Sequence, residues 1–180
     1  MKLAEIIKMR TSNSKFDSRP VDNQLIIDIL ETAVYAPNHK MREPWRFIIL
    51  NGENKEVFVD RYLQTLSNKV KIEIEPLIHK VFQAPSVLAF ITPSNSDLRD
   101  GIEDLEAVAT LIQNFLLLAT ESDLATSWKT PLYSETDAFK DILGLKSGEL
   151  IVGLVMVGYS EFIKPAKIRK SAASLTTIYR

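Results

Sequence analysis

The sequence predicts an α+β fold in a single domain that spans residues 1–180. Segments with the apolar periodicity of helices are mixed with short β-branched segments, and they do not follow a regular βαβ order. The 180 residues, of which 46% are hydrophobic, have the length and composition of one ordinary globular domain. The chain has no cysteine, which excludes a disulfide framework, a thiolate nucleophile and a cysteine-ligated metal.

The predicted elements follow from periodicity, capping residues and turn residues. In chain order they are a short helix ending before Thr11, a helix from Asp22 to near Pro37, a strand over 45–50, one or two helices over 55–82 that break near Pro76, a strand over 86–92, a helix over 103–121, a short strand over 126–128, a helix over 136–143 and a strand over 150–157. The middle of the helix over 103–121 is apolar nearly all round, so we expect a central helix or a subunit interface there. Its uncharged run, 107–120, is shorter than the ~20 residues that span a bilayer.

The charge balance limits the possible partners. Lys and Arg number 22 against 23 Asp and Glu, whereas a sequence-independent nucleic-acid binder would normally be strongly basic. The first eight residues alternate charged and apolar side chains instead of forming the apolar run of a secretory signal. We therefore expect a cytoplasmic protein whose partners include neither nucleic acid nor membrane.

Two basic segments, one near each end of the chain, could bind a phosphate or another anion. Residues 10–16 place the Arg10 guanidinium, several hydroxyls and the Lys15 ammonium directly after the first helix. The tail from residue 162 onward has no acid and five cations, Lys164, Lys167, Arg169, Lys170 and Arg180. The alternatives are a solvated helix end and a basic tail with a general affinity for anions.

Two further segments could line a ligand site. The loop over 36–47, held between prolines, could project His39 toward a ligand. In the segment 126–131, Trp128 could pack on the fold while Lys129 and Thr130 point into a pocket. The alternatives are a surface loop and a core tryptophan beside an exposed lysine.

Several catalytic patterns are missing from the sequence. It contains no GxGxxG, GxxxxGK[ST], HExxH or GxSxG motif. His39 and His79 are the only histidines, and they are too few and too far apart in sequence to indicate a metal site. We expect neither a metal ligand nor a catalytic side chain of the hydrolytic kind.

Taken in order, these segments resemble the nitroreductase family of FMN-dependent oxidoreductases, and the resemblance runs nearly end to end. The matching segments are Arg10-Thr11-Ser12, Ala36-Pro37, Pro44-Trp45-Arg46-Phe47, Trp128-Lys129-Thr130, Val152-Gly153 to Gly158 and Lys167-Ile168-Arg169-Lys170. The loop sequence Asn38-His39-Lys40 is most similar to the small single-domain branch of NAD(P)H nitroreductases.

The resemblance implies a three-layer α+β fold with a central, mainly antiparallel sheet flanked by helices. It also implies a homodimer that exchanges its C-terminal segments and binds FMN at the subunit interface. The implied cofactor-binding residues are Arg10, Thr11, Ser12, Ser14, Tyr35, His39, Trp128, Lys129, Thr130, Lys167 and Arg169. Among them, Arg10 and Ser12 would hold phosphate or ribityl oxygens, and Tyr35 and His39 would approach the flavin from the partner subunit.

Some positions depart from the family pattern. Thr11 and Ser14 stand where a cation is frequent, Met41 stands where Asn is common, and Ser122-Asp123-Leu124-Ala125 replaces a glycine-rich stretch. A cation beside the flavin N1–C2=O edge would stabilise the reduced cofactor. Lys15, Lys129 or His39 could supply that charge, and the sequence does not choose among them.

The activity implied by the resemblance is an FMN-dependent oxidoreductase that uses NAD(P)H as co-substrate. Hydride would pass through flavin N5 to a nitroaromatic, a quinone or a similar small-molecule oxidant in a ping-pong cycle. Two alternatives stay open: a flavin-binding protein with little or no reductase turnover, and a small anion-binding or regulatory domain without flavin.

Overall fold

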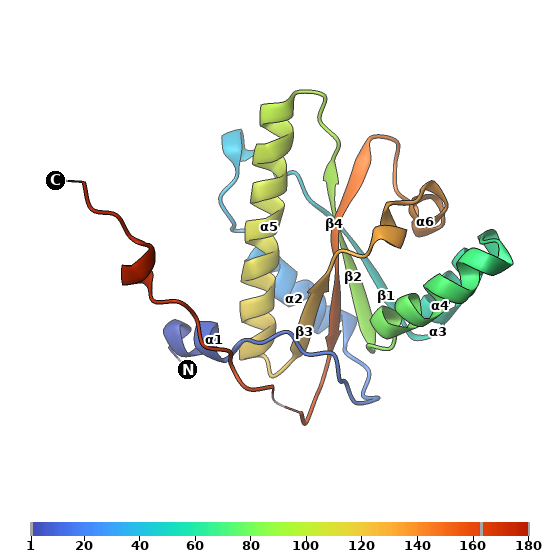
Figure 1. Ribbon diagram of the computed structural model, residues 1–180, viewed down its shortest axis with the longest axis horizontal. Helices are drawn as coiled ribbons and strands as arrows, with labels where there is room; N and C mark the ends of the chain where they lie inside the picture. The colour runs from blue at the N-terminus through green and yellow to red at the C-terminus, as the bar shows by residue number, and fades with distance from the viewer. Residues whose placement is uncertain (1, 163, 180) are drawn as a thin grey trace.

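The computed structural model describes residues 2–162 and 164–179, so the predicted tail cation Arg180 lies outside the described residues. A four-stranded antiparallel sheet lies between two layers of helices (Figure 1). Its strands are β1 (Arg46–Asn51), β2 (Ser86–Pro93), β3 (Ala125–Lys129) and β4 (Glu149–Gly158), in the order β1-β2-β4-β3. This arrangement confirms the predicted α+β fold with an antiparallel sheet.

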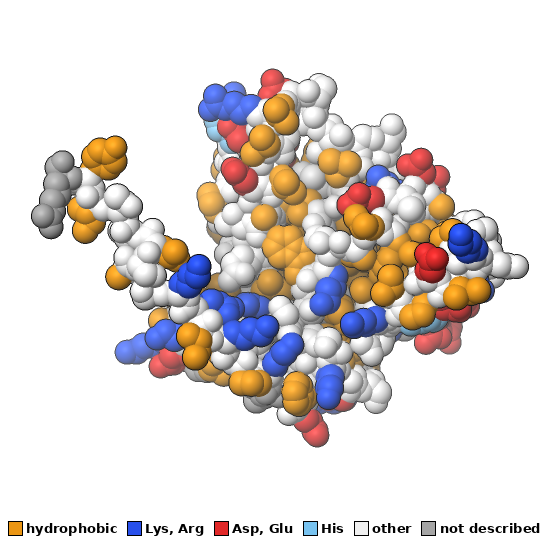
Figure 2. Space-filling model, in the orientation of Figure 1, with side chains coloured by type: hydrophobic (Ala, Val, Ile, Leu, Met, Phe, Trp, Pro, Cys, Tyr) orange, Lys and Arg blue, Asp and Glu red, His pale blue; other side chains and the backbone are white. Residues whose placement is uncertain are grey.

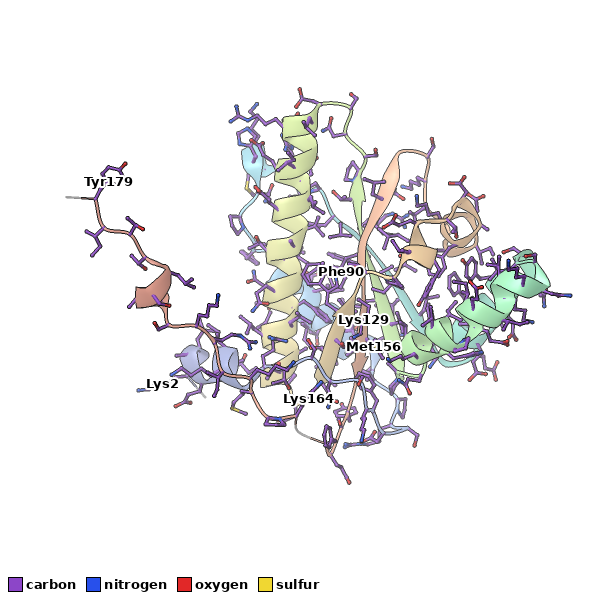
Figure 3. All side chains as sticks on the ribbon, in the orientation of Figure 1. Lys2, Phe90, Lys129, Met156, Lys164 and Tyr179 are labelled. Atoms are coloured by element: carbon purple, nitrogen blue, oxygen red, sulfur yellow. The ribbon has the colours of Figure 1, made fainter. Side chains whose placement is uncertain are left out.

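The helices are divided between the two faces of the sheet (Figure 1). One side carries α1 (Leu3–Met9), α2 (Asn23–Ala33) and α5 (Leu98–Glu121), and the other carries α3 (Gly52–Thr65), α4 (Asn68–Phe82) and α6 (Asp137–Leu143). Three short 3-10 helices are η1 (His39–Met41), η2 (Leu132–Glu135) and η3 (Ala172–Leu175). Each face has its own apolar core: Phe90 belongs to the core beside α2 and α5, and Met156 to the core on the opposite face (Figure 3).

Helix α5 begins five residues before the predicted start at residue 103. The side chain of Asp97 accepts hydrogen bonds from the backbone N–H groups of Arg99 and Asp100, at 2.9 and 3.0 Å. Such an N-cap satisfies donors that the first turn leaves unpaired, so the helix starts where the cap stands. The predicted cap of α2 is confirmed, because the Asp22 carboxylate accepts from the Gln24 N–H at 3.0 Å.

The predicted break near Pro76 is wrong. Pro76 lies inside α4, and the chain interrupts its helices instead between α3 and α4, at residues 66–67. A proline has no backbone N–H, so the carbonyl four residues earlier in the helix loses its hydrogen-bond donor. Here that carbonyl belongs to Ile72, which is 74% exposed, so water can solvate it. Burial of Ile78, Val81 and Phe82 against the core holds the helix together across the proline.

The two ends of the chain meet beside the edge strand β3. Ser12 forms an isolated parallel bridge with Thr126, and the chain after β4 runs back along the N-terminal segment before the tail leaves the body of the protein (Figure 1). Among the helices of the described residues, none combines the length and apolar composition needed to cross a membrane.

Candidate functional site

A small cationic cavity lies where the N-terminal segment meets the tail. Its volume is about 230 Å³, and it is lined by Arg10, Thr11, Ser12, Lys164, Pro165, Lys167 and Arg169. Four of these seven residues are cations and none is an acid. Figure 2 shows Lys and Arg side chains gathered in this region, beside α1 at the base of the tail. The structure thus brings together the two basic segments that the sequence places at opposite ends of the chain.

Two hydrogen bonds lie at this cavity, one between the two segments and one within the tail. The hydroxyl of Thr11 donates to the backbone carbonyl of Lys164 at 3.3 Å. The guanidinium of Arg169 donates to the carbonyl of Lys167 at 3.2 Å, which keeps these two tail residues close together. Lys164 was not among the predicted binding residues, although its place in the acid-free tail was a signal for it (Figure 3).

Asn13 is a second residue that sequence reasoning missed. Its side chain is buried, and its amide nitrogen donates to the Ser160 hydroxyl at 2.9 Å and to the Phe162 carbonyl at 2.7 Å. Its backbone N–H donates to the carbonyl of Thr126 in β3 at 2.9 Å. Asn13 therefore connects the N-terminal segment, the sheet edge and the start of the tail, a role that no local pattern indicates.

The residues predicted on β3 divide between the two faces of the sheet. Trp128 lies opposite Val155 and packs against the core beside α5, whereas Lys129 lies opposite Leu154 on the other face. The Trp128 indole N–H is buried and finds no hydrogen-bond partner among residues 2–162 and 164–179. Thr130, the residue after the strand, is exposed.

The backbone of β3 offers polar groups along its outer edge. The carbonyl of Thr126 points away from β4, because it accepts from the N–H of Asn13. Alternate residues of an antiparallel strand direct their N–H and C=O groups to the same side, so those of Trp128 also point outward. Among the described residues this edge is bridged only at Ser12, which leaves the Trp128 backbone groups free for a ligand.

Ser14 and Lys15 follow the cavity residues but do not line the cavity. The Ser14 carbonyl accepts a hydrogen bond from the Gln83 side chain at 3.2 Å. The Lys15 ammonium lies over the ring of Phe162, 4.7 Å from its centroid. Lys15 is one of the three residues that could replace the positive charge missing at Ser14, and its ammonium is already engaged in this cation–π contact.

The loop that carries His39 is strained and strongly anchored. Lys40, Met41 and Glu43 have φ angles of 52°, 52° and 48°, in the left-handed region that residues other than glycine rarely adopt. Arg42 holds this loop to the first turns of α5. Its guanidinium contacts Asp100 at 3.1 Å, Glu103 at 3.4 Å and the buried Asp104 at 2.8 Å.

His39 faces the same acidic group, with Nδ1 3.9 Å from a carboxylate oxygen of Glu103. A hydrogen bond from Arg99, together with the nearby His39 and Arg42, holds the pKa of Glu103 below its usual value. Tyr35, just after α2, has 87% of its surface exposed. Neither Tyr35 nor His39 is among the residues that line the cationic cavity.

The short helix η1, which carries His39, contacts α5 near its start, whereas α1 and the base of the tail lie near the end of α5 (Figure 1). Glu103 is near the start of the helix, whereas Thr120, near its end, lines a second cavity that shares Arg10, Thr11 and Lys164 with the first. At 1.5 Å per residue, the distance along the helix from Glu103 to Thr120 is about 25 Å. The described residues of one chain therefore do not bring His39 together with the predicted phosphate-binding residues.

Comparisons with known proteins place the sequence in one family. Residues 7–159 match the sequence profile of the Nitroreductase family. The chain is 30% identical over 172 residues to the Bacillus subtilis protein YfhC, provisionally named an NAD(P)H nitroreductase, with 93% of this chain and 89% of YfhC covered.

Solved structures show the same similarity. The crystal structure of a nitroreductase-like family protein from Bacillus cereus superimposes with a TM-score of 0.92 at 29% identity, covering 99% of this chain and 96% of the other. The FMN and NADPH-dependent nitroreductase NfnB from Sphigopyxis sp. strain HMH has the same fold at 16% identity, with a TM-score of 0.79 and coverage of 100% and 99%.

Proposed function

The chain belongs to the nitroreductase family, a family of oxidoreductases, and we propose that it is an FMN-dependent enzyme that uses NAD(P)H to reduce small oxidants such as nitroaromatics or quinones. The observation that carries this proposal is the cationic cavity that Arg10, Lys167 and Arg169 share. FMN is the cofactor of NfnB, which has the same fold. A cytoplasmic location and a single domain over 1–180 stay predictions.

The cavity has the donors that a phosphate monoester requires. Guanidinium and ammonium groups give charge-assisted hydrogen bonds to phosphate oxygens, and the hydroxyls of Thr11 and Ser12 add short ones. With Lys164 in addition to the three predicted cations, the positive charge exceeds that of the phosphate. We therefore assign the terminal phosphate of FMN to this cavity and its ribityl oxygens to Ser12.

The outer edge of β3 is the proposed contact for the isoalloxazine ring. Its free polar groups at Trp128 suit the alternating donors and acceptors of a flavin edge, and Thr130 extends the same edge. Figure 2 shows apolar side chains gathered on the visible face between α5 and the helices on the other side of the sheet. A flat aromatic ring requires an apolar surface of this kind to pack against. Lys129 remains as a cation on this strand that could approach the flavin.

We also propose a homodimer that completes the site. Apolar residues along one stripe of α5 are exposed, with Leu98 at 79% and Ile102 and Leu105 at 48% each. In the tail, Ile168 and Tyr179 are almost fully exposed, on a segment that extends away from the body (Figures 1 and 3). Exposed apolar surface of this kind is typical of an interface between subunits. A second copy would bring its own Tyr35 and His39 to the flavin, which the same chain's loop cannot reach.

Bound FMN would supply the redox chemistry, taking hydride from NAD(P)H at N5 and passing electrons to the oxidant. The residues of the chain bind and orient the cofactor. The cations of the cavity would hold the phosphate, and the edge of β3 would fix the ring. No side-chain nucleophile is needed, in keeping with a chain that lacks cysteine.

The test of this proposal is the double variant Arg10→Ala/Arg169→Ala. Each charge-assisted phosphate bond is worth about 1.5–3 kcal/mol, so we expect the protein purified with excess FMN to lose its absorption between about 350 and 500 nm. The matched control is Lys170→Ala, which removes a tail cation that does not line the cavity. Full flavin occupancy in the double variant would place the phosphate elsewhere, and a colourless wild-type protein that binds no added FMN would overturn the proposal.

One observation favours a second candidate, a flavin-binding protein with little turnover. The cation frequent in the family at position 14 is replaced by Ser14, and the neighbouring Lys15 ammonium is already placed over Phe162. A flavin without a cation beside its pyrimidine edge is harder to reduce. Mixing the FMN-loaded protein with NADH or NADPH without oxygen distinguishes the two: rapid bleaching indicates the enzyme, and persistent colour indicates the binding protein.

A further inference from the structure

We propose that Asn13 is the positioning residue that holds the tail cations in place for the phosphate, an inference that rests on the proposed FMN site. Asn13 does not line the cationic cavity itself, and it carries no charge. It acts on the segment that follows β4 after Gly158 and leads into the tail. The tail provides Lys164, Lys167 and Arg169 to the cavity.

The side chain of Asn13 has all of its hydrogen-bonding groups engaged. The residue is 5% exposed, its amide nitrogen has two tail acceptors, and its carbonyl oxygen accepts from the backbone N–H of Lys15 at 3.1 Å. The amide orientation is determined by these partners, because the reverse orientation would place two oxygens together at Phe162 and two N–H groups together at Lys15. A buried amide with these partners is expensive to disturb.

The anchor stands just before the part of the tail that lines the cavity. Phe162, whose carbonyl Asn13 holds, precedes Lys164 by two residues and Arg169 by seven. A chain of seven residues can extend over roughly 25 Å, so these cations could leave the cavity if their start were not fixed. Fixing the start raises their effective concentration beside Arg10.

Other contacts at the start of the tail give support but no equivalent anchor. The Asp17 N–H donates to the Tyr159 carbonyl at 2.9 Å, and the Arg19 guanidinium lies over the Tyr159 ring. The Thr11 bond to Lys164 is exposed and longer, at 3.3 Å. We therefore expect the loss of the Asn13 side chain to loosen the tail from residue 160 onward without releasing it completely.

The experiment compares Asn13→Leu with the wild-type chain in two measurements. In the flavin-free protein, hydrogen exchange should become faster in peptides covering residues 11–17 and 159–164 and stay unchanged in α4. In binding titrations, FMN affinity should fall about tenfold, the change that corresponds to one ordinary hydrogen bond, while riboflavin affinity stays within about twofold. Riboflavin lacks the phosphate, so the ratio of the two affinities isolates the cavity from any general damage to the fold.

The matched control is Asn114→Leu, which removes an amide-to-carbonyl bond from Asn114 to Ala33 between α5 and α2, away from the tail. If Asn13→Leu does not fold, Asn13→Ser, which is too short to reach the tail carbonyl, takes its place. Unchanged exchange, or equal losses of FMN and riboflavin affinity, would overturn the positioning role. If the wild-type chain binds no FMN, the proposed cofactor is wrong. Hydrogen exchange alone then tests whether Asn13 holds the tail in place.

Discussion

Trp128 lies so closely over Gly153 that a Cβ atom on Gly153 would fall 1.9 Å from the indole Nε1. The two residues are on neighbouring strands, β3 and β4. The indole covers the glycine next to the point where the pairing of β4 with β2 shifts by one residue. Only a residue without a side chain leaves room for the ring. The position of the proposed flavin-binding strand thus depends on a glycine in the strand beside it.

The variant Gly153→Ala should therefore displace the Trp128 indole toward solvent. In a Trp45→Phe background, which leaves Trp128 as the only tryptophan, we expect a red shift of its fluorescence. Overpacking of this kind costs about 1–3 kcal/mol, and urea unfolding measures it. A control is Gly101→Ala in α5, where a Cβ would meet its nearest neighbour at 3.6 Å, an ordinary contact. An unshifted spectrum in Gly153→Ala would contradict the prediction.

Removal of Arg42 should destabilise the protein because it leaves the buried carboxylate of Asp104 uncompensated. We expect Arg42→Met to lower the urea midpoint clearly, and the double variant Arg42→Met/Asp104→Leu to recover most of the loss. The comparison is a double-mutant cycle, completed by Asp104→Leu alone. If the double variant is no more stable than Arg42→Met, the coupling between these two residues is absent.

The free energy of unfolding should decrease at low pH because protonation of Glu149 weakens its ion pair with Arg46. The hydrogen bond from Arg46 holds the pKa of Glu149 below its ordinary value of 4.5. Because the folded-state pKa is lowered, the stabilisation is complete above the unfolded-state pKa and is lost as pH falls through the folded-state pKa. Unfolding free energies measured from about pH 6 down to about pH 3 should thus decline more steeply in the wild type than in Glu149→Gln. Parallel curves would refute the assignment to Glu149.

The variant Ile102→Asp/Leu105→Asp should convert the proposed dimer into monomers. Charges on this exposed apolar stripe of α5 would have to be buried or paired in an interface. Sedimentation equilibrium gives the mass, and flavin content should fall with it because each site would lose the partner's loop. Ile72→Asp is the control, since Ile72 is also exposed but lies on α4. A dimer that survives the change would show that its interface lies elsewhere.

The local elements of this fold could be predicted because their signals are local. The cap at Asp22, the strand over 45–50 and the buried strand over 150–157 depend on side chains within a few residues of each other. The break expected at Pro76 failed because packing of the helix face outweighs the loss of one exposed hydrogen bond. The early start of α5 depended on Asp97, an N-cap signal present in the sequence.

The candidate site could be predicted only in part. The cations Arg10, Lys167 and Arg169 were expected, because guanidinium and ammonium groups are recognisable phosphate ligands wherever they occur. Asn13 was not, because an asparagine after Ser12 has the same local pattern whether it is a turn residue or a buried anchor. The separation of His39 from the cavity depended on the length and direction of α5.

The sequence by itself determined the types and order of the chemical groups: a hydroxyl-rich basic segment, a tryptophan strand, a basic tail and no nucleophilic thiol. Only the tertiary structure decided which of them meet. Residues 10–12 and 164–169 share one cavity because β3 and Asn13 bring the two ends of the chain together. The physical reason is that charge and hydrogen-bonding capacity belong to a residue, whereas contact between distant segments depends on the packing of the whole chain.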